Sequence, residues 1–269
     1  MTMHKNGCAK VGNTEMYYVA FGEGEKNLIV LPGLSDGLWT VKGKAWLLAG
    51  SYKHFLNDYT VYMFSRKNEL PEGYSIKDMA DDQAEALKNL GVEKTMVIGV
   101  SQGGMVAQLL AANYPELVEK LILVVTAPYA NDTIKSVVTK WIEMTTTSTH
   151  TDLMLDTADK VYTAQFNEKN KKYLPLVARF TKPANYDRFL KNAYAILNFD
   201  ARAELPKIKC PTYIMSGNCD NTVGNDAPYE LKEGIAGSEV MIFDGLGHGL
   251  FEEDKHFYDK VLAFCNRPS

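Results

Sequence analysis

The sequence predicts an α/β fold: a doubly wound, mostly parallel β-sheet with helices inserted near the carboxyl edge of the sheet. Short apolar runs alternate with helical patterns over most of the 269 residues. Several of these runs are continuously apolar, as expected for strands that helices cover on both faces. One stretch, 129–203, is helix-patterned throughout. We therefore expect a core of residues 1–128 and 204–269 with a helical cap of residues 129–203.

The expected strands are the apolar runs at 16–21, 28–31, 61–64, 95–100, 121–126, 212–216 and 240–243. A helix is predicted between the third and fourth of them. Ser75 and Asp78 have capping-box spacing, an apolar stripe follows, and Gly91 is typical of a helix end. Repeated strand–helix–strand units favour a parallel sheet.

The insertion contains a polar interruption at 145–151 and prolines at 175 and 183, and strand character returns only at 211–215. In an open parallel sheet, ligands bind at the carboxyl ends of the strands. Helices inserted there are expected to act as a lid.

Composition indicates a globular chain and gives few hints of a macromolecular partner. The formal net charge of −4 gives no electrostatic case for binding nucleic acid or an anionic membrane. No apolar run is long enough to span a bilayer, and the first residues lack a signal-peptide pattern, so a cytoplasmic location is expected. The four cysteines are scattered and are expected as free thiols, with Cys219 as a small filler side chain.

The most informative motif is G-x-S-x-G at residues 99–103, between an apolar run and a helical pattern. A strand that turns sharply into a helix holds the central residue in a strained conformation and exposes its side chain. The glycines give clearance where side chains would collide. Ser101 is therefore predicted to be a nucleophile.

A serine nucleophile needs a base, and His248 is the candidate. It lies in a glycine-rich loop at 244–249, directly after an expected strand. His4, His54, His150 and His256 lie in helical or terminal segments and are expected at the surface.

The base needs an acid that orients it, and Asp220 is favoured for this role. It follows the expected strand at 212–216, so it lies at the same edge of the sheet as His248. Asp244 and Asp200 are the rivals.

An oxyanion hole would complete the site. One donor is expected to be the backbone N–H of Gln102, the residue after the nucleophile. The second is expected from the loop at 31–37, with the N–H of Leu34 as candidate and Gly33 allowing close approach.

With these residues, the chain resembles the α/β-hydrolase superfamily, specifically its small capped serine esterase-like members. The order Ser101, Asp220, His248 is the order of that superfamily. Two departures stand out: Pro32 replaces the histidine that relatives often carry in the oxyanion loop, and residues 64–75 lack most of the Asp-x-x-Gly-x-Gly-x-Ser pattern. The resemblance implies the α/β-hydrolase fold and hydrolase chemistry, and it leaves the subfamily open.

We expect hydrolysis of a small or medium carboxylic ester through an acyl-enzyme on Ser101, without cofactor or metal. No metal-binding spacing, phosphate loop or dinucleotide motif occurs in the sequence. The partner is expected to be a small ester-like molecule, and the oligomeric state is open. Aromatic residues expected at the pocket are Trp39, Tyr129, Trp141 and Tyr194.

Other functions fit the same residues. Within enzymes, the triad would also serve an acyltransferase, thioesterase, peptidase, lactonase or carbon–carbon bond hydrolase. Outside enzymes, a small-molecule receptor could retain the triad. The intact Ser–Asp–His set favours an enzyme, and sustained turnover discriminates it from a receptor.

Overall fold

A computed structural model describes residues 3–268, and these form an eight-stranded sheet in the order β1-β2-β4-β3-β5-β6-β7-β8. β1 pairs with β2 and β2 with β4 in antiparallel fashion, and every other neighbouring pair is parallel. The strands are β1 (His4–Val11), β2 (Thr14–Phe21), β3 (Lys26–Leu31), β4 (Tyr59–Lys67), β5 (Thr95–Val100), β6 (Val118–Val124), β7 (Thr212–Gly217) and β8 (Glu239–Phe243). The predicted fold class is confirmed.

Each predicted apolar run lies in or overlaps a strand, but β1 was not predicted. This edge strand, HKNGCAKV, pairs on one side only and is mostly exposed, so it has no apolar run to reveal it. The strand predicted at 121–126 begins and ends earlier than expected: β6 starts at Val118 and stops at Val124, because Val125 has a φ of 44°.

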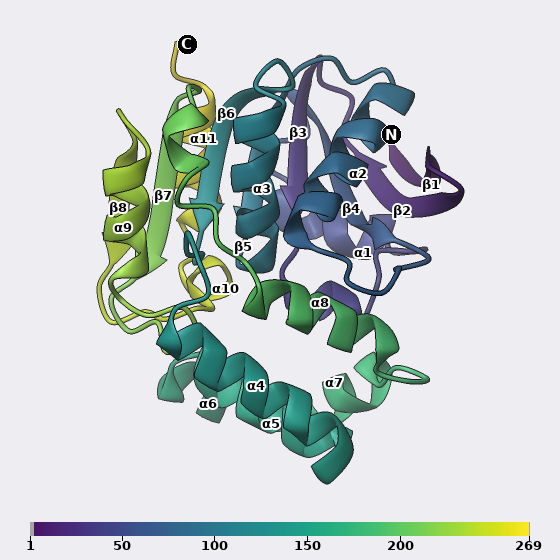
Figure 1. The fold of residues 1–269 in the computed structure, drawn as a ribbon, viewed down its shortest axis with the longest axis vertical. Coiled ribbons are helices and arrows are strands. Elements are labelled where there is room, and N and C mark those ends of the chain that lie inside the picture. The colour runs from purple at the N-terminus through teal and green to yellow at the C-terminus, as the bar shows by residue number, and fades with distance from the viewer. Residues whose placement is uncertain (1–2, 269) are drawn as a thin grey trace.

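Helices cover both faces of the sheet (Figure 1). One face packs against α2 (Ile76–Asn89), α3 (Gln102–Asn113) and α9 (Ala227–Gly234). The other packs against α1 (Ala45–Ala49) and α11 (Phe257–Cys265). Helix α2 begins at the predicted capping box, in which Ser75 and Asp78 bond each other's backbone N–H. Strands enclosed in this way carry the continuous apolar runs seen in the sequence.

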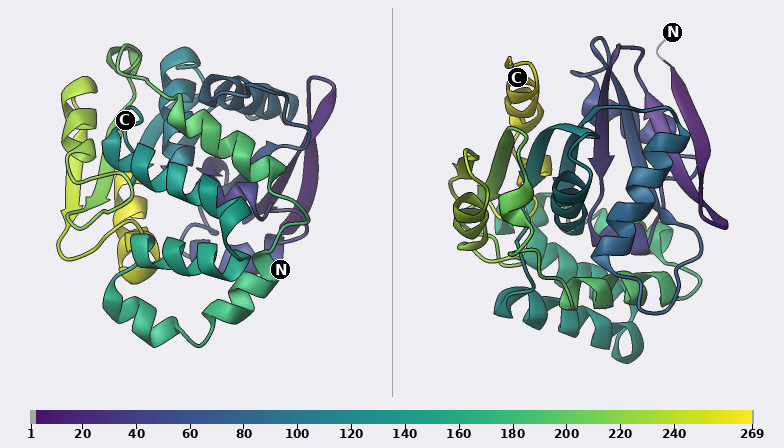
Figure 2. Two further views of the ribbon diagram at one scale, coloured as in Figure 1. Left: turned by 60° about the horizontal axis from the view of Figure 1, so that its bottom comes forward. Right: turned by 45° about the horizontal axis from the view of Figure 1, so that its top comes forward.

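Five α-helices lie between β6 and β7: α4 (Asp132–Thr147), α5 (His150–Val161), α6 (Ala164–Asn170), α7 (Leu174–Thr181) and α8 (Asp187–Leu197). Figure 2 shows them lying across the carboxyl ends of the parallel strands. Short elements complete the chain: the 3-10 helices η1 (Leu34–Gly37), η2 (Gly50–Tyr52) and η3 (Leu205–Lys207), and the helix α10 (Leu250–Glu253). Within the described part of the chain, no helix is long and apolar enough to cross a membrane.

Candidate active site

Ser101 lies at the sharp turn between β5 and α3, with φ 54° and ψ −119°. This conformation is costly for a residue with a side chain and persists only where its surroundings enforce it. Close packing of the turn explains the neighbouring glycines. A Cβ on Gly103 would lie 1.9 Å from the Leu31 carbonyl oxygen, and one on Gly104 would lie 2.6 Å from the Thr126 side chain. The Thr126 hydroxyl also donates to the Ser101 carbonyl at 2.8 Å.

The structure brings Ser101, His248 and Asp220 into one hydrogen-bonded chain. The His248 Nε2 atom lies 3.0 Å from the Ser101 Oγ atom. On the other side of the ring, Nδ1 lies 2.9 Å from Oδ2 of Asp220 and 3.1 Å from Oδ1. Because a carboxylate only accepts, this pairing places a proton on Nδ1 and leaves Nε2 to accept from the serine.

Asp220 is itself fixed by its loop. Its Oδ1 atom accepts from the backbone N–H of Thr222 at 2.8 Å and of Val223 at 3.0 Å. Its carboxylate is buried, so these donors replace solvent. The two rivals are engaged elsewhere: Asp244 accepts from the Asn218 amide, and Asp200 pairs with Arg202.

The two expected oxyanion donors lie on either side of Ser101. Leu34 begins η1, and the preceding Gly33 approaches so closely that a Cβ on it would lie 3.3 Å from the Ser101 Cβ. Gln102 begins α3, where a helix leaves its first N–H groups without intrahelical partners. Both N–H groups therefore lack a protein partner in the described part of the chain.

A buried arginine, which the sequence reasoning did not identify, links the two segments that carry these N–H groups. The Arg66 Nη2 atom donates to the Pro32 carbonyl at 2.8 Å and to the Gln102 Oε1 atom at 3.2 Å. Burial lowers the pKa of the guanidinium, while the nearby Asp36 carboxylate opposes that shift. Its position at the end of the apolar run of β4 was the only signal available in the sequence.

Helix α8 is tied into the same polar cluster. The Gln102 side chain donates to the Asn192 carbonyl at 2.8 Å. Arg188 binds the buried Asp36 carboxylate at 2.9 Å and donates to the carbonyls of Arg66 and Lys67. Helix α8 is thus anchored to the segments that carry the two candidate donors.

A cavity of about 580 Å³ lies between Ser101, His248 and the inserted helices. Most of its lining is apolar, and Glu252 and Tyr162 are polar exceptions. The Tyr162 hydroxyl donates to Glu252 at 2.8 Å. Glu252 is exposed to solvent, but the protein atoms around its carboxyl desolvate it enough to raise its pKa. The cavity size is typical of sites for small molecules.

Two of the four aromatic residues expected at the pocket line this cavity, Trp39 and Trp141. Tyr129 does not: its hydroxyl donates to Glu230 on α9, and Arg202 covers its ring. Tyr194 is half exposed, because Ile196 occupies the cavity side of α8 and a helix turns about 200° over two residues.

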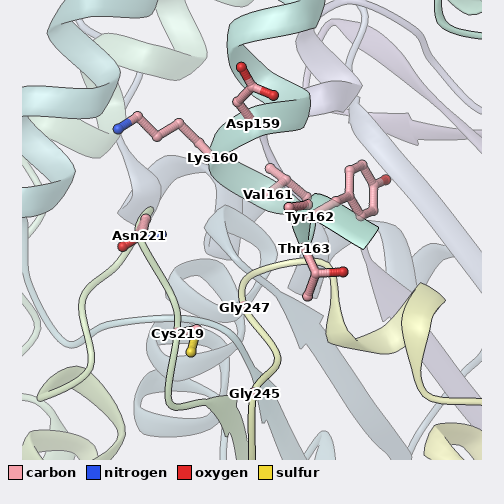
Figure 3. Close-up of a pocket in the computed structure, with 10 residues that line it drawn as sticks. Asp159, Lys160, Val161, Tyr162, Thr163, Cys219, Asn221, Gly245 and Gly247 are labelled. Carbon is pink, nitrogen blue, oxygen red and sulfur yellow. The ribbon is translucent and has the colours of Figure 1, made fainter. Parts of the chain in front are cut away.

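A second cavity, of about 310 Å³, lies where the end of α5 meets the loops that carry Asp220 and His248 (Figure 3). Cys219 lines it and is exposed. The loop is held there by backbone, since the Cys219 N–H donates to the Leu246 carbonyl at 2.9 Å.

His150 was expected at the surface and is instead buried in the insertion. Its ring nitrogens contact the Tyr186 hydroxyl at 2.8 Å and the Thr181 hydroxyl at 3.2 Å. Burial lowers its pKa, and Lys182 adds to the effect. Its place at the first position of α5, facing α7, cannot be inferred from local sequence.

Comparisons with known proteins agree with this fold. A sequence model of the alpha/beta hydrolase fold matches residues 27–255. The "Putative carbamate hydrolase RutD" of Serratia proteamaculans is 26% identical over 207 residues, which cover 73% of this chain and 74% of that protein. An alpha/beta hydrolase enzyme from a Medee basin deep-sea metagenome library superposes with a TM-score of 0.86 at 21% identity, covering 98% of both chains. The enol-lactonase from Burkholderia xenovorans gives a TM-score of 0.80 at 23% identity, covering 97% of this chain and 100% of the other.

Proposed function

The chain belongs to the α/β-hydrolase fold family, and from that membership and its site we propose that it is a serine hydrolase that cleaves a small or medium carboxylic ester. The observation that carries the proposal is the hydrogen-bonded chain from Ser101 through His248 to Asp220 at the wall of the large cavity. Nucleophile, base and orienting acid are within hydrogen-bond reach of one another, as covalent catalysis requires.

In the first half of the reaction, His248 removes the proton from Ser101 as the serine oxygen attacks the ester carbonyl. The N–H groups of Leu34 and Gln102 bind the oxyanion that forms, each contributing on the order of 3 kcal/mol. His248 then protonates the leaving alcohol, and the acyl group remains on Ser101. Asp220 holds the imidazole tautomer and stabilises its protonated form.

In the second half, a water molecule replaces the alcohol. His248 takes a proton from this water as it attacks the acyl carbonyl, and the same two N–H groups bind the second oxyanion. Collapse of this intermediate releases the carboxylic acid and returns the proton to Ser101.

The cavity supports an apolar acyl group as the part of the substrate that is recognised. Aliphatic and aromatic side chains of α4, α5 and α7, Trp141 among them, line it together with Trp39 from the loop after η1. The related proteins are named for a carbamate and a lactone, in which a carbonyl is also attacked. These names differ in the leaving group, so they do not identify the leaving group for this chain. Both are compatible with transfer of an acyl group to water.

The test is labelling with a fluorophosphonate serine probe, followed by peptide mass spectrometry and assays with p-nitrophenyl esters. We expect the adduct on Ser101 and loss of both adduct and turnover in Ser101→Ala. Ser35→Ala is the matched control, because Ser35 lines the same cavity outside the triad and its loss should leave labelling intact.

A folded protein that gives neither adduct nor Ser101-dependent turnover would contradict the proposal and favour a binding role. A stoichiometric burst without sustained turnover would favour the receptor alternative. Transfer of the acyl group to an added alcohol or thiol, in preference to water, would identify an acyltransferase.

A further inference from the structure

Helix α7 turns its apolar face outward. Tyr173, Leu176, Val177 and Phe180 follow the spacing i, i+3, i+4 and i+7 of one helix face. All four are exposed, and Phe180 retains 72% of its surface. Only Ala178 of this helix is buried. A helix normally buries such a face, so α7 presents a surface that nothing in the described chain covers.

A second exposed apolar group lies in the segment 38–47. Trp46 on α1 is 82% exposed, and its neighbour Leu47 is also exposed. Trp39, in the same segment, lines the catalytic cavity, and so do Tyr173 and Val177 of α7. Each of the two exposed groups therefore lies in a segment that also lines this cavity. We call them together the apolar rim: Trp39, Trp46, Leu47, Tyr173, Leu176, Val177 and Phe180.

Basic residues outnumber carboxylates in both segments of the chain that carry the apolar rim. Residues 163–182 contain Lys169, Lys171, Lys172, Arg179 and Lys182 against the single carboxylate of Glu168. Residues 38–57 contain three lysines, Lys42, Lys44 and Lys53, and no carboxylate. The Lys44 ammonium lies 3.7 Å from the centre of the Trp39 ring.

This local charge is opposite in sign to the whole chain, whose formal net charge is −4. Electrostatic attraction to a surface acts over about 10 Å at moderate salt, so the charge of the contacting face decides it. The net charge of the whole chain gave no electrostatic case for an anionic membrane. That value sums over all residues and therefore hides the basic character of these two segments.

We propose that the apolar rim docks on an anionic lipid surface, with the cavity opening toward it. Exposed Trp, Phe and Leu beside Lys and Arg is the composition of segments that lie in the headgroup region of a bilayer. Large side chains that project outward suit a fluid lipid surface, and the surrounding cations suit its negative charge. The chain would bind peripherally, since none of its described helices could span a bilayer.

The proposal deepens the proposed function and rests on it for the substrate: an amphiphilic ester whose acyl chain passes from the lipid surface into the cavity. Tyr173 and Val177 belong both to the rim and to the cavity wall, so an acyl chain would stay in contact with apolar side chains along this path. Such a path spares the chain exposure to water.

The test is cosedimentation of the protein with vesicles of phosphatidylcholine alone or mixed with phosphatidylglycerol. Two double variants probe the rim: Lys171→Gln with Lys172→Gln, and Leu176→Ser with Phe180→Ser. Their matched controls are Lys94→Gln with Lys209→Gln, and Tyr229→Ser. Lys94 and Lys209 are exposed just before β5 and β7, at the sheet edge opposite Ser101, and Tyr229 is an exposed aromatic residue on α9.

We expect binding to the mixed vesicles that weakens with salt and little binding to phosphatidylcholine alone. Each lysine near an anionic surface contributes about fivefold, so the lysine pair should lose roughly 25-fold in affinity. The Leu176 and Phe180 pair should lose at least about tenfold, because two apolar anchors are removed. The controls should bind as the native protein does, and turnover of a water-soluble short ester should be unchanged in all of these variants.

Three outcomes would overturn the proposal. The first is absence of vesicle binding, or equal binding of rim variants and controls. The second is a dimer in sedimentation velocity that Leu176→Ser with Phe180→Ser converts to monomers, since a second copy would then cover the rim. The third is binding to polyglutamate without binding to vesicles, which would assign the face to an acidic protein. Because sedimentation needs no turnover, repeating it with Ser101→Ala separates failure of docking from failure of the hydrolase proposal.

Discussion

At the scale of single residues, the candidate site depends on how each proton donor and acceptor is held. Asp220 uses Oδ1 for the backbone N–H groups of Thr222 and Val223, and its Oδ2 atom makes the shorter contact to His248. The carboxylate therefore accepts hydrogen bonds from two buried backbone N–H groups and from the imidazole at the same time. This division of roles predicts what a neutral replacement would do.

In Asp220→Asn, the amide oxygen should keep the two backbone donors, which leaves the NH₂ group facing Nδ1 of His248. Nδ1 must then accept, its proton moves to Nε2, and the ring can no longer act as base toward Ser101. We expect kcat to fall about 10⁴-fold with KM little changed, measured by steady-state ester hydrolysis. Asp244→Asn, which alters a carboxylate bound to Asn218, is the control and should retain activity.

At the scale of elements, side-chain hydrogen bonds hold together the separate segments that form the candidate site. Arg66 at the end of β4 connects the loop after β3 with the start of α3, and Gln102 continues the connection to α8. The two candidate oxyanion donors thus have a common support. Arg66 is a positioning residue in this arrangement, because it acts through the backbone that carries the donors.

Arg66→Lys should lower kcat about 10- to 100-fold with a smaller effect on KM, since lysine is shorter and lacks the planar guanidinium that places the Nη2 atom between the Pro32 carbonyl and the Gln102 side chain, and small displacements of the donors are costly. Affinity for a phosphonate that mimics the oxyanion should fall in parallel. The assay temperature must lie well below the Tm of the variant, because Arg66 is buried and its replacement disturbs the packing around it. An unchanged kcat in folded Arg66→Lys would contradict this role; Arg202→Lys, at an exposed arginine, serves as control.

The junction of α5, α7 and α8 should respond to pH through His150. Burial lowers the pKa of this imidazole, so the folded protein favours the neutral ring. Its contribution to stability is therefore complete above the unfolded pKa of about 6.5 and is lost as pH falls through the lower folded value. Tm measured from about pH 8 down to about pH 5 should fall more steeply in the native protein than in His150→Gln. Parallel curves for the two proteins would show that His150 does not contribute.

At the scale of the whole molecule, the cavity exists because two layers meet. The sheet edge supplies Ser101 and His248, and the inserted helices supply most of the apolar wall. The side chains that close the cavity come from residues 33 to 252 of the chain. The length of acyl chain that the cavity can hold consequently depends on how the sheet and the inserted helices pack together.

We expect kcat/KM for p-nitrophenyl esters to rise about fourfold for each added methylene until the cavity is filled, at about 0.8 kcal/mol per buried methylene. Measuring acetate, butyrate, hexanoate and octanoate esters tests this. Val138→Phe should shift the optimum to shorter chains, because Val138 lines the cavity from α4. A flat chain-length profile would show that the acyl group does not enter.

Much of the fold could be predicted from the sequence because its signals are local. The apolar runs, the capping box at Ser75 and the glycines around Ser101 report steric and periodic requirements within a few residues. The strand–turn–helix at Ser101 and the strand loops that carry Asp220 and His248 follow from such signals. The edge strand β1 gave no such signal, because it pairs with a strand on one side only and most of its side chains are exposed to solvent.

The sequence by itself determined the fold class and a short set of candidate residues for the chemistry. Only the tertiary structure decided which aspartate lies beside His248, that Arg66 joins the two oxyanion segments, that His150 is buried, and that Tyr129 and Tyr194 lie away from the cavity. Each of these depends on contacts between segments distant in the chain. Local patterns carry no information about such contacts, because the same side chain is stable in several environments until its distant neighbours are in place.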